Sequence, residues 1–373
     1  MSALLGFHGA RGVTLVELMV AMLIGCTVMA AALELYAHGR SVYRVNERMA
    51  RLQEQGRLAL SVIEPDIELA GYYGFTNMPD TVRFVRGANP DATLATAAQM
   101  RQFGLHASDP LPPAVNGLPP GAHVCGINFA IDITMPVQGS NDVFALGRSR
   151  AASCNAYQAR PQVGADTLTL RRVETSNSAP EAGRIQVYAS RLTSRTSQMM
   201  FADGHAPGAI DADHRVHNLV VRSYYIARDS VGQRDFPALR VKSLTRSGSG
   251  VIFDEDEVMP GIEDLQVQFG IDTGDYDNDG RVDAAVDSDG DGVPDPTGRA
   301  TRYVNPDFAQ LPQVQVVSVR MWLRIRSDEA EAGFIDTRTY RYGDVVYTPA
   351  GAERSFRRVV MSRTVALRNA RWM

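Results

Sequence analysis

The feature that most constrains this chain is an apolar segment near its amino terminus. From Val13 to Leu33 the sequence runs for 21 residues, and Glu17 is the only one with a strongly polar side chain. About 20 such residues form one helix that is long enough to cross the hydrocarbon core of a membrane. Arg11 lies just before the segment, and a cation on that flank favours a cytoplasmic amino terminus. The rest of the chain is then expected on the other side of the membrane.

Glu17 needs a cationic partner, because an ionised carboxylate in hydrocarbon costs on the order of 3 kcal/mol. The apolar segment contains no cation. Cleavage after Gly12 would give Val13 a free α-ammonium group and would make Glu17 the fifth residue of the mature chain. We predict that Glu17 pairs with such an amino terminus. It is either that of its own chain or that of a neighbouring copy, and the second would set the stagger between subunits.

The helix is expected to continue beyond the membrane as an amphipathic helix. Apolar residues recur at steps of three and four, which is the pattern of one apolar stripe on a helix. The stripe consists of Val42, Val45, Met49, Leu52, Gly56, Ala59 and Ile63. Because no proline lies between Val13 and Glu64, we expect a helix of about 50 residues, or about 75 Å, that breaks at Pro65. Its outer half should pack on the protein's own sheet.

The remainder of the chain favours β-structure. Alternating or β-branched runs, which are typical of antiparallel strands with one solvent-exposed face, occur at residues 166–173, 184–188, 219–226, 265–269, 314–325 and 359–367. The segment 108–121 contains five prolines and is expected to be a loop. With 45% hydrophobic residues, the chain is able to bury a sizeable core.

Cys125 and Cys154 form the only pair of cysteines outside the apolar segment. They are 29 residues apart, without a C-x-x-C motif or a neighbouring histidine, so zinc and thioredoxin chemistry are not indicated. We favour a disulfide formed in an oxidising compartment over two unrelated buried thiols.

The charge of the chain is unevenly distributed. The formal net charge is −4, but residues 254–295 contain fifteen acidic side chains and one basic side chain, which leaves +10 for the rest. That positive remainder shows no runs of basic residues interleaved with aromatic residues, so nucleic acid is not expected as a partner.

Two tandem repeats within the acidic segment predict calcium sites. Residues 275–283 and 287–295 both match D-x-D-x-D-G-x-x-D, 12 residues apart. Such loops offer carboxylates at positions 1, 3, 5 and 9, a glycine turn at 6 and a backbone carbonyl at 7, and hard oxygen donors select Ca²⁺. The predicted ligands are Asp275, Asp277, Asp279, Arg281 and Asp283 in the first repeat and Asp287, Asp289, Asp291, Val293 and Asp295 in the second, with Arg281 and Val293 contributing carbonyls.

Position 12 is Val286 or Gly298, so neither repeat has the bidentate glutamate of an EF-hand. The repeats look more like those of thrombospondin type 3 or dockerin-like modules. Nine carboxylates in residues 272–295 would repel one another without cations, so we predict that two Ca²⁺ ions order this loop. The alternative is a solvated acidic loop without metal.

Other candidate sites are weaker. His205, His214 and His217 lie near three aspartates, but residues three apart in a strand point to opposite faces. We therefore favour surface histidines over a zinc site. The sequence contains no P-loop, G-x-S-x-G, H-E-x-x-H or dinucleotide-binding turn, and an enzyme is not predicted.

The sequence around Gly12 resembles a known signal. Arg-Gly followed by Val-Thr-Leu-Val-Glu is similar to the class III signal of type IV pilins and type II secretion pseudopilins, although Val13 stands where phenylalanine is commonest. The resemblance implies cleavage after Gly12 by prepilin peptidase, methylation of Val13 and a role for Glu17 in assembly. The alternatives are a secretory signal cut near Ala30, a lipoprotein lipidated on Cys26, and an uncleaved anchor.

Three further motifs resemble the PilW family of type IV pilus minor pilins. They lie at residues 57–75, which include Asp66-Ile-Glu-Leu-Ala-Gly-Tyr-Tyr-Gly-Phe75, at residues 261–272, and at residues 356–369. The resemblance implies a long helix on a β-rich body and a place in the minor-pilin complex at the pilus tip.

We therefore expect an α+β, pilin-like fold, in which a long N-terminal helix with a membrane half and an amphipathic half packs on a β-rich antiparallel body with a calcium-binding loop. The expected parts are a leader at residues 1–12, the membrane and assembly half of the helix at 13–36, its amphipathic half at 37–75, and a periplasmic or extracellular body at 76–373 with the calcium loop at 272–298.

The expected function is that of a structural minor pilin that helps to initiate pilus assembly. Its expected partners are prepilin peptidase, the inner membrane before assembly, other minor pilins and the major pilin through the helix, and a tip adhesin. It should lie first in the inner membrane and then at the pilus tip on the cell surface. The alternatives are a J-type minor pseudopilin of type II secretion and, in another class, a secreted or lipid-anchored calcium-dependent binding module.

Overall fold

The computed structural model describes residues 14–76, 82–85, 93–96, 125, 129–146, 152–191, 198–248, 250–274, 298–309, 311 and 314–370. The chain divides into two units, Met1–Arg51 and Leu52–Met373. Gly12, Val13, the proline-rich segment 108–121 and all ten predicted calcium ligands lie outside the described residues. The second unit, which contains the sheets, is called the body below.

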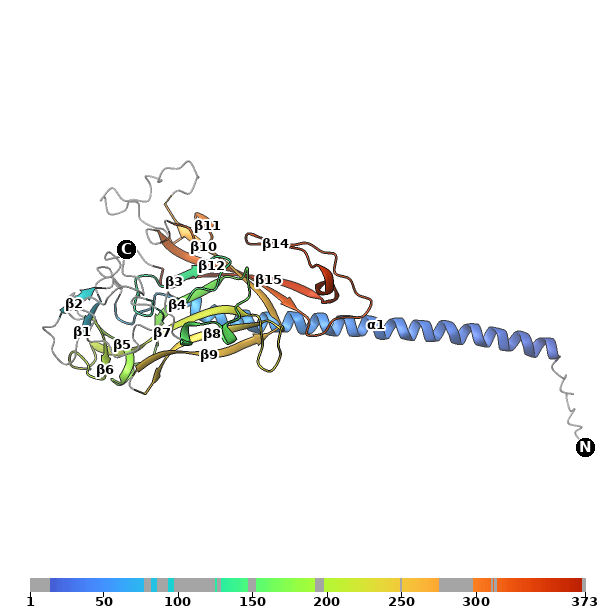
Figure 1. Ribbon diagram of the computed structural model, residues 1–373, viewed down its shortest axis with the longest axis horizontal. Helices are drawn as coiled ribbons and strands as arrows, with labels where there is room; N and C mark the ends of the chain where they lie inside the picture. Colours follow the sequence, from blue (N-terminus) through green and yellow to red (C-terminus); the bar gives the residue numbers. More distant parts are fainter. Residues whose placement is uncertain are drawn as a thin grey trace, which may run out of the picture. The chain divides into compact units, whose positions relative to one another are not determined.

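A single helix, α1, runs from Leu15 to Glu68 (Figure 1). The predicted break at Pro65 is wrong, since the helix continues for three residues beyond it. A proline costs a helix most in its interior, where it removes one hydrogen bond and crowds the preceding turn. Pro65 lacks an N–H for the preceding turn, but the next bond is made, since Leu69 N–H donates to Pro65 O at 3.1 Å. The chain leaves the helix at Gly71, which has a φ of +79° and donates its N–H to Arg171 O on the sheet.

The larger sheet contains nine described strands (Figure 1). Seven of them follow the order β2-β1-β6-β5-β7-β4-β3, while β8 pairs with β7 and β9 pairs with β8. Only the β1–β6 pair is parallel among these described pairs. The strands are β1 Arg83–Val85, β2 Thr93–Thr96, β3 Val137–Ser140, β4 Thr167–Val173, β5 Ala182–Ser190, β6 Met199–Asp203, β7 His214–Ala227, β8 Ala238–Ser247 and β9 Gly250–Pro260.

The smaller sheet is antiparallel in the order β11-β10-β12-β15. A two-stranded hairpin, β13–β14, and three short 3₁₀ helices complete the described elements. Their bounds are β10 Ile262–Asp272, β11 Arg302–Val304, β12 Gln315–Arg326, β13 Tyr340–Tyr342, β14 Val345–Tyr347, β15 Arg358–Ala366, η3 Ala152–Cys154, η4 Tyr157–Ala159 and η6 Gly351–Ser355. All six strands predicted from the sequence are confirmed, as β4, β5, β7, β10, β12 and β15.

The strands β8 and β9 were not among those predicted from the sequence, and β9 contains the acidic run 254–257. In the structure, Glu255 accepts hydrogen bonds from Arg240 at 2.9 Å and Lys242 at 3.1 Å, and Glu257 accepts one from Arg240 at 3.0 Å. Because these basic side chains come from β8, β9 holds its carboxylates in a sheet rather than in a solvated loop.

The alternation in the smaller sheet is confirmed, but its polar face is not solvent-exposed as expected. Leu265 opposes Leu323 on the apolar face, and Asp264 opposes Arg324 on the other. Both polar side chains are nonetheless buried. The β13–β14 hairpin covers them, and Tyr342 donates a hydrogen bond to Asp264 at 2.5 Å. The alternation of apolar and polar residues in a strand does not indicate whether another part of the chain covers its polar face. Here the β13–β14 hairpin does.

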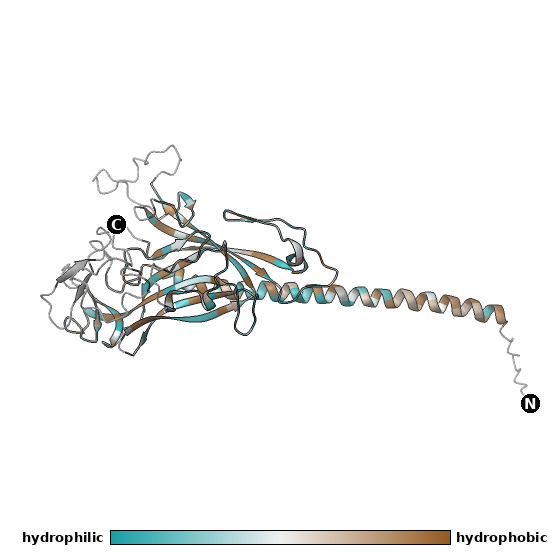
Figure 2. Ribbon diagram, viewed as in Figure 1, coloured by the Kyte–Doolittle hydropathy of each residue, from teal (hydrophilic) through white to brown (hydrophobic). Residues whose placement is uncertain are grey.

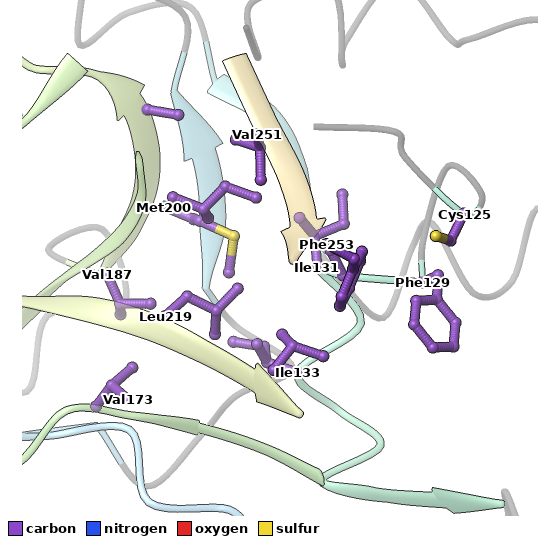
Figure 3. Packing of buried hydrophobic residues seen from close by; sticks show 14 of the residues in the cluster. Cys125, Phe129, Ile131, Ile133, Val173, Val187, Met200, Leu219, Val251 and Phe253 are labelled. Atoms are coloured by element: carbon purple, nitrogen blue, oxygen red, sulfur yellow. The ribbon is translucent and has the colours of Figure 1, made fainter. Parts of the chain in front are cut away.

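The main hydrophobic cluster lies within the larger sheet and the segment that precedes β3 (Figure 3). Val187 of β5 and Leu219 of β7 pack there with Ile131, Ile133 and residues of β9. Arg171 is fully buried beside this cluster, and it donates to the carbonyls of Phe129 and Met135. These bonds fasten the segment before β3 to β4.

The last part of α1 packs on the body, as the stripe predicted. Leu52, Ala59 and Ile63 are buried. Gly56 lies so close to Met361 of β15 and Ile325 of β12 that a methyl group on it would overlap with the Met361 sulfur. A side chain at position 56 would therefore require the Met361 side chain to move. Together, the long helix and the antiparallel sheets form the expected α+β, pilin-like fold.

Candidate assembly helix and acidic loop

Glu17 lies in the first turn of α1 and takes part in its cap. Glu17 N–H donates to the Thr14 hydroxyl at 3.3 Å, and Thr14 N–H donates to the Glu17 carboxylate at 3.5 Å. This reciprocal pair is a capping box, which satisfies two backbone donors at the start of a helix. Thr14 and Glu17 form the T-x-x-E signature of this cap in the sequence, although Glu17 was expected only to provide a charge. The side chain is exposed.

The first half of α1 consists mostly of apolar residues (Figure 2), and they are exposed. Its large apolar side chains from Leu15 to Tyr36 are each more than half exposed, and this part of the helix is long and apolar enough to cross a membrane. Cys26 is a free thiol on the same surface. Contiguous apolar surface of this extent marks a contact with lipid or with another protein, because in water it would drive association.

Asp66 anchors the other end of α1 in the body. Its carboxylate accepts hydrogen bonds from Arg172 at 3.0 Å, from Arg222 at 2.8 Å and from the Tyr224 hydroxyl at 2.6 Å. Asp66 is 2% exposed, and a buried carboxylate persists only when it is paired and hydrogen-bonded in this way. The helix is thus joined to β4 and β7 by one charged residue.

Two outer ion pairs lie beside this buried one. Glu64 contacts Arg363 of β15 at 2.7 Å, and Glu68 contacts Arg368 at 2.7 Å. All four side chains are partly exposed to solvent, so each pair contributes little to stability. They fix the position of the helix along the smaller sheet more than they stabilise it.

The residues that follow α1 continue into the core. The Tyr73 hydroxyl donates to Ile133 O at 2.6 Å. Gly74 has a φ of +75° and lies against the ring of His217, where a Cβ atom would come within 2.8 Å of the ring. The segment from Asp66 to Gly74 therefore consists of an ion-pair anchor, a turn and a core tyrosine.

The histidines do not form a metal cluster. His217 was expected at the surface, but it is 2% exposed, and its Nδ1 lies 2.9 Å from Ser176 O. His214 bonds to Asp211, whereas His205 bonds to Asp203. Within the part of the chain that the structure describes, no group of three or more His, Cys, Asp or Glu residues is placed to hold a metal ion.

The acidic loop is described only at its base. Asp272 ends β10, and its carboxylate accepts the N–H of Gly274 at 3.1 Å and that of Gly298 at 2.9 Å. Thr273 also bonds to Thr301 across the base, at 2.9 Å between the hydroxyl oxygens. The described residues on the two sides of the segment 275–297 are thus joined by the buried Asp272 carboxylate and by the Thr273–Thr301 hydrogen bond.

The Cys125–Cys154 disulfide is confirmed. Both cysteines are buried and belong to the main hydrophobic cluster. The bond joins the segment before β3 to η3.

A cavity of about 300 Å³ lies between the end of the smaller sheet and the β7–β8 loop. Its charged lining is paired within itself: Arg228 with Asp235 at 3.0 Å, Arg324 with Glu263 at 3.1 Å, and Arg326 with Glu353 at 3.1 Å. Burial alone would raise the pKa of Glu263, but the hydrogen bond from Arg358 and the charge of Arg324 hold that pKa below its ordinary value. These groups neutralise one another, which suits a structural role better than acid–base catalysis.

Two family models match parts of this chain. The model described as type IV pilus-assembly protein W matches residues 223–369, from the end of β7 to just past β15. The model of the prokaryotic N-terminal methylation motif matches residues 8–33, which include Gly12, Glu17 and the start of α1. No curated protein and no solved structure matches the chain significantly. The two matches support a PilW-like type IV pilin, that is, a structural component of the pilus.

Proposed function

We propose that this PilW-like type IV pilin is cleaved after Gly12 by prepilin peptidase, is held in the inner membrane by α1, and enters the pilus through the same helix. There it helps to initiate assembly as part of the tip complex. The observation that carries this proposal is the exposed apolar surface from Leu15 to Tyr36, with one carboxylate in its first turn.

The same surface serves both states of the proposed cycle. In the membrane, lipid covers the apolar side chains. In the pilus, the helices of the other minor pilins and of the major pilin cover them, so the subunit leaves the lipid without exposing apolar area to water. Glu17 then pairs with the α-ammonium group of its own chain or of a neighbour. This partner is needed because an ionised carboxylate in an apolar environment is unfavourable.

The anchoring of α1 suits a subunit that is moved by its helix. Asp66, Glu64 and Glu68 join the helix to three separate parts of the body. We infer that these contacts, Asp66 above all, keep the last part of α1 attached to the sheets when the subunit is extracted.

We further propose that the segment 275–295 binds two Ca²⁺ ions. The support is the donor chemistry of the two repeats and the closed base at Asp272, which keeps the ends of the loop together whatever its interior binds. In the tip complex, an ordered calcium loop would present a rigid surface to a neighbouring pilin or a tip adhesin.

Mass spectrometry of the mature amino terminus tests processing. A chain that begins at methylated Val13 supports the proposal. A diacylglyceryl group on Cys26 or a chain that begins at Ala31 would instead identify a lipoprotein or a secreted module.

The assembly role of Glu17 is tested by a pair of variants. Glu17→Gln removes the charge but preserves the capping box, since glutamine also forms it. Thr14→Ala breaks the cap and preserves the charge. We expect Glu17→Gln to insert and be processed but to be absent from sheared pili, and Thr14→Ala to be incorporated. Normal incorporation of Glu17→Gln would show that the charge has no role in assembly.

A further inference from the structure

The part of α1 that directly follows the apolar surface carries a distinct group of side chains. Tyr36, Arg40, Tyr43 and Arg44 are all exposed. With 3.6 residues per turn, these four residues lie within an arc of about 100° on one side of the helix. We call this group the tyrosine–arginine face.

The two arginines of this face have no acidic partner among the residues that the structure describes. Within the described residues, neither Arg40 nor Arg44 forms an ion pair, whereas the next arginine on the same side, Arg51, is bound to Glu47 at 2.9 Å. The pair at Glu47 and Arg51 therefore marks the end of the face. Two exposed cations are left directly beside the apolar surface.

The depth of this face follows from the helix geometry. The 22 residues from Thr14 to Leu35 span about 33 Å, close to the thickness of a hydrocarbon core, and the headgroup layer adds about 5–7 Å on each side. Tyr36 then falls within the headgroup layer, and Arg40, about 7.5 Å beyond Leu35, lies at its outer edge. The long side chain of Arg44 reaches back toward it, as arginine side chains do at membrane surfaces.

We propose that the tyrosine–arginine face binds the phosphate groups of anionic phospholipids in the outer leaflet of the inner membrane. This inference rests on the proposed membrane anchoring of α1. Tyrosine is enriched at this depth because its ring is apolar and its hydroxyl is polar, and arginine binds phosphate through a planar fork of N–H donors. The face fits a lipid because it follows the apolar surface directly and carries two arginines. The exposed Glu34 at the same level lies on another side of the helix.

This contact would hold the subunit at a defined depth until it is extracted. Two arginine–phosphate contacts keep Arg44 at the membrane surface, so the body cannot drift away from or into the bilayer. Extraction into the pilus must break both contacts. Their strength would then set how readily this subunit leaves the membrane.

The full-length chain in nanodiscs of equal amounts of phosphatidylcholine and phosphatidylglycerol tests the proposal. Native mass spectrometry counts the lipids that stay bound when the disc is removed. We expect phosphatidylglycerol to be retained over phosphatidylcholine by about fivefold per arginine contact, and this preference to fall at 1 M salt. Arg40→Gln with Arg44→Gln should remove the preference, while the double lysine variant should keep most of it.

Arg57→Gln is the matched control, because Arg57 is an exposed arginine of the same helix outside the face. It should leave the lipid preference unchanged. Equal retention of both lipids by the natural chain, or an unchanged preference in the double glutamine variant, would overturn the inference. If lipid preference is absent and the double variant instead loses its co-isolation with other pilins, the face is a protein contact. Failure of the chain to span the nanodisc would refute the anchoring itself and the proposed function with it.

Discussion

Asp66 of α1 and Arg222 of β7 form an ion pair of 2.8 Å, although 156 residues separate them in the chain. Arg172 and Tyr224 complete the shell around the same carboxylate. A buried charge with three partners on two strands admits one position of the helix. This residue therefore decides how α1 is seated on the body.

Asp66→Asn should destabilise the body by about 3 kcal/mol, because removing one partner of a buried ion pair leaves the other charges uncompensated. Urea unfolding of the unit that begins at Leu52 measures this change. Glu64→Gln is the control, since it breaks a partly exposed pair with Arg363 and should cost no more than about 1 kcal/mol. Equal losses of stability in the two variants would contradict the conclusion that the buried Asp66 ion pair stabilises the attachment of α1 more than the outer pair does.

Replacing Cys125 and Cys154 by serine should lower the stability of the body by about 3–4 kcal/mol, the value expected for a closed loop of this length. The two cysteines are 29 residues apart in the sequence. Thermal unfolding with and without a reductant tests the prediction. Cys26→Ser removes only the free thiol of α1 and should leave the melting temperature of the body unchanged in both conditions.

Calcium should bind to the acidic loop with a stoichiometry of two. Calorimetric titration of the body should show heat of binding, and Asp277→Asn with Asp289→Asn should abolish most of it, because each change removes a carboxylate from one repeat. Asp254→Asn with Asp256→Asn removes two exposed carboxylates of β9 instead and should bind calcium normally. A natural chain that gives no heat at millimolar Ca²⁺ would end the calcium proposal.

Asp166 should make the stability of the body depend on pH. It is buried between β4 and β10, where it accepts the N–H of Asp142 at 2.8 Å and that of Val267 at 2.7 Å. Burial raises the pKa of Asp166 to about 7, against the N–H bonds that lower it, and the charges of Asp344 and Asp264 raise it further. Folding thus favours the neutral carboxyl.

The stabilising contribution of this neutral carboxyl is complete below the unfolded pKa of about 4 and is lost as the pH rises through about 7. Between pH 5 and pH 8 the free energy of unfolding should fall by about 2–3 kcal/mol more in the natural chain than in Asp166→Asn. Parallel pH profiles of the two proteins would show that Asp166 is ionised throughout this range.

Repeating patterns in the sequence predicted the elements of this fold. The long helix follows from the apolar segment after Val13 and from the stripe that ends at Ile63, and the six predicted strands follow from period-two alternation. These signals depend on neighbours two to four residues apart, so a single sequence contains them. The pairing of Cys125 with Cys154 was predictable for a different reason, since no other pair was open in the body of the chain.

The partners of polar residues were not predictable in this way. The acidic run 254–257 forms part of a strand because Arg240 and Lys242 of β8 bond to Glu255. His217 was expected at the surface, but in the structure the turn at Gly74 lies against its ring. Asp264 lies on a face that alternation makes polar, yet the hairpin of β13 and β14 buries it. In each case the contact that determines the burial joins residues that are distant in the sequence, and short-range sequence patterns do not report on such pairs.

The sequence by itself therefore determined the apolar helix, the β-rich body and the tandem acidic repeats, because periodicity and composition act locally. Only the tertiary structure decided that Asp66 holds the end of the helix in the body and that Asp272 bonds to both Gly274 and Gly298 at the base of the acidic loop. A charged side chain is stable when buried only if oppositely charged or hydrogen-bonding groups surround it. Packing of the whole chain brings those groups into place.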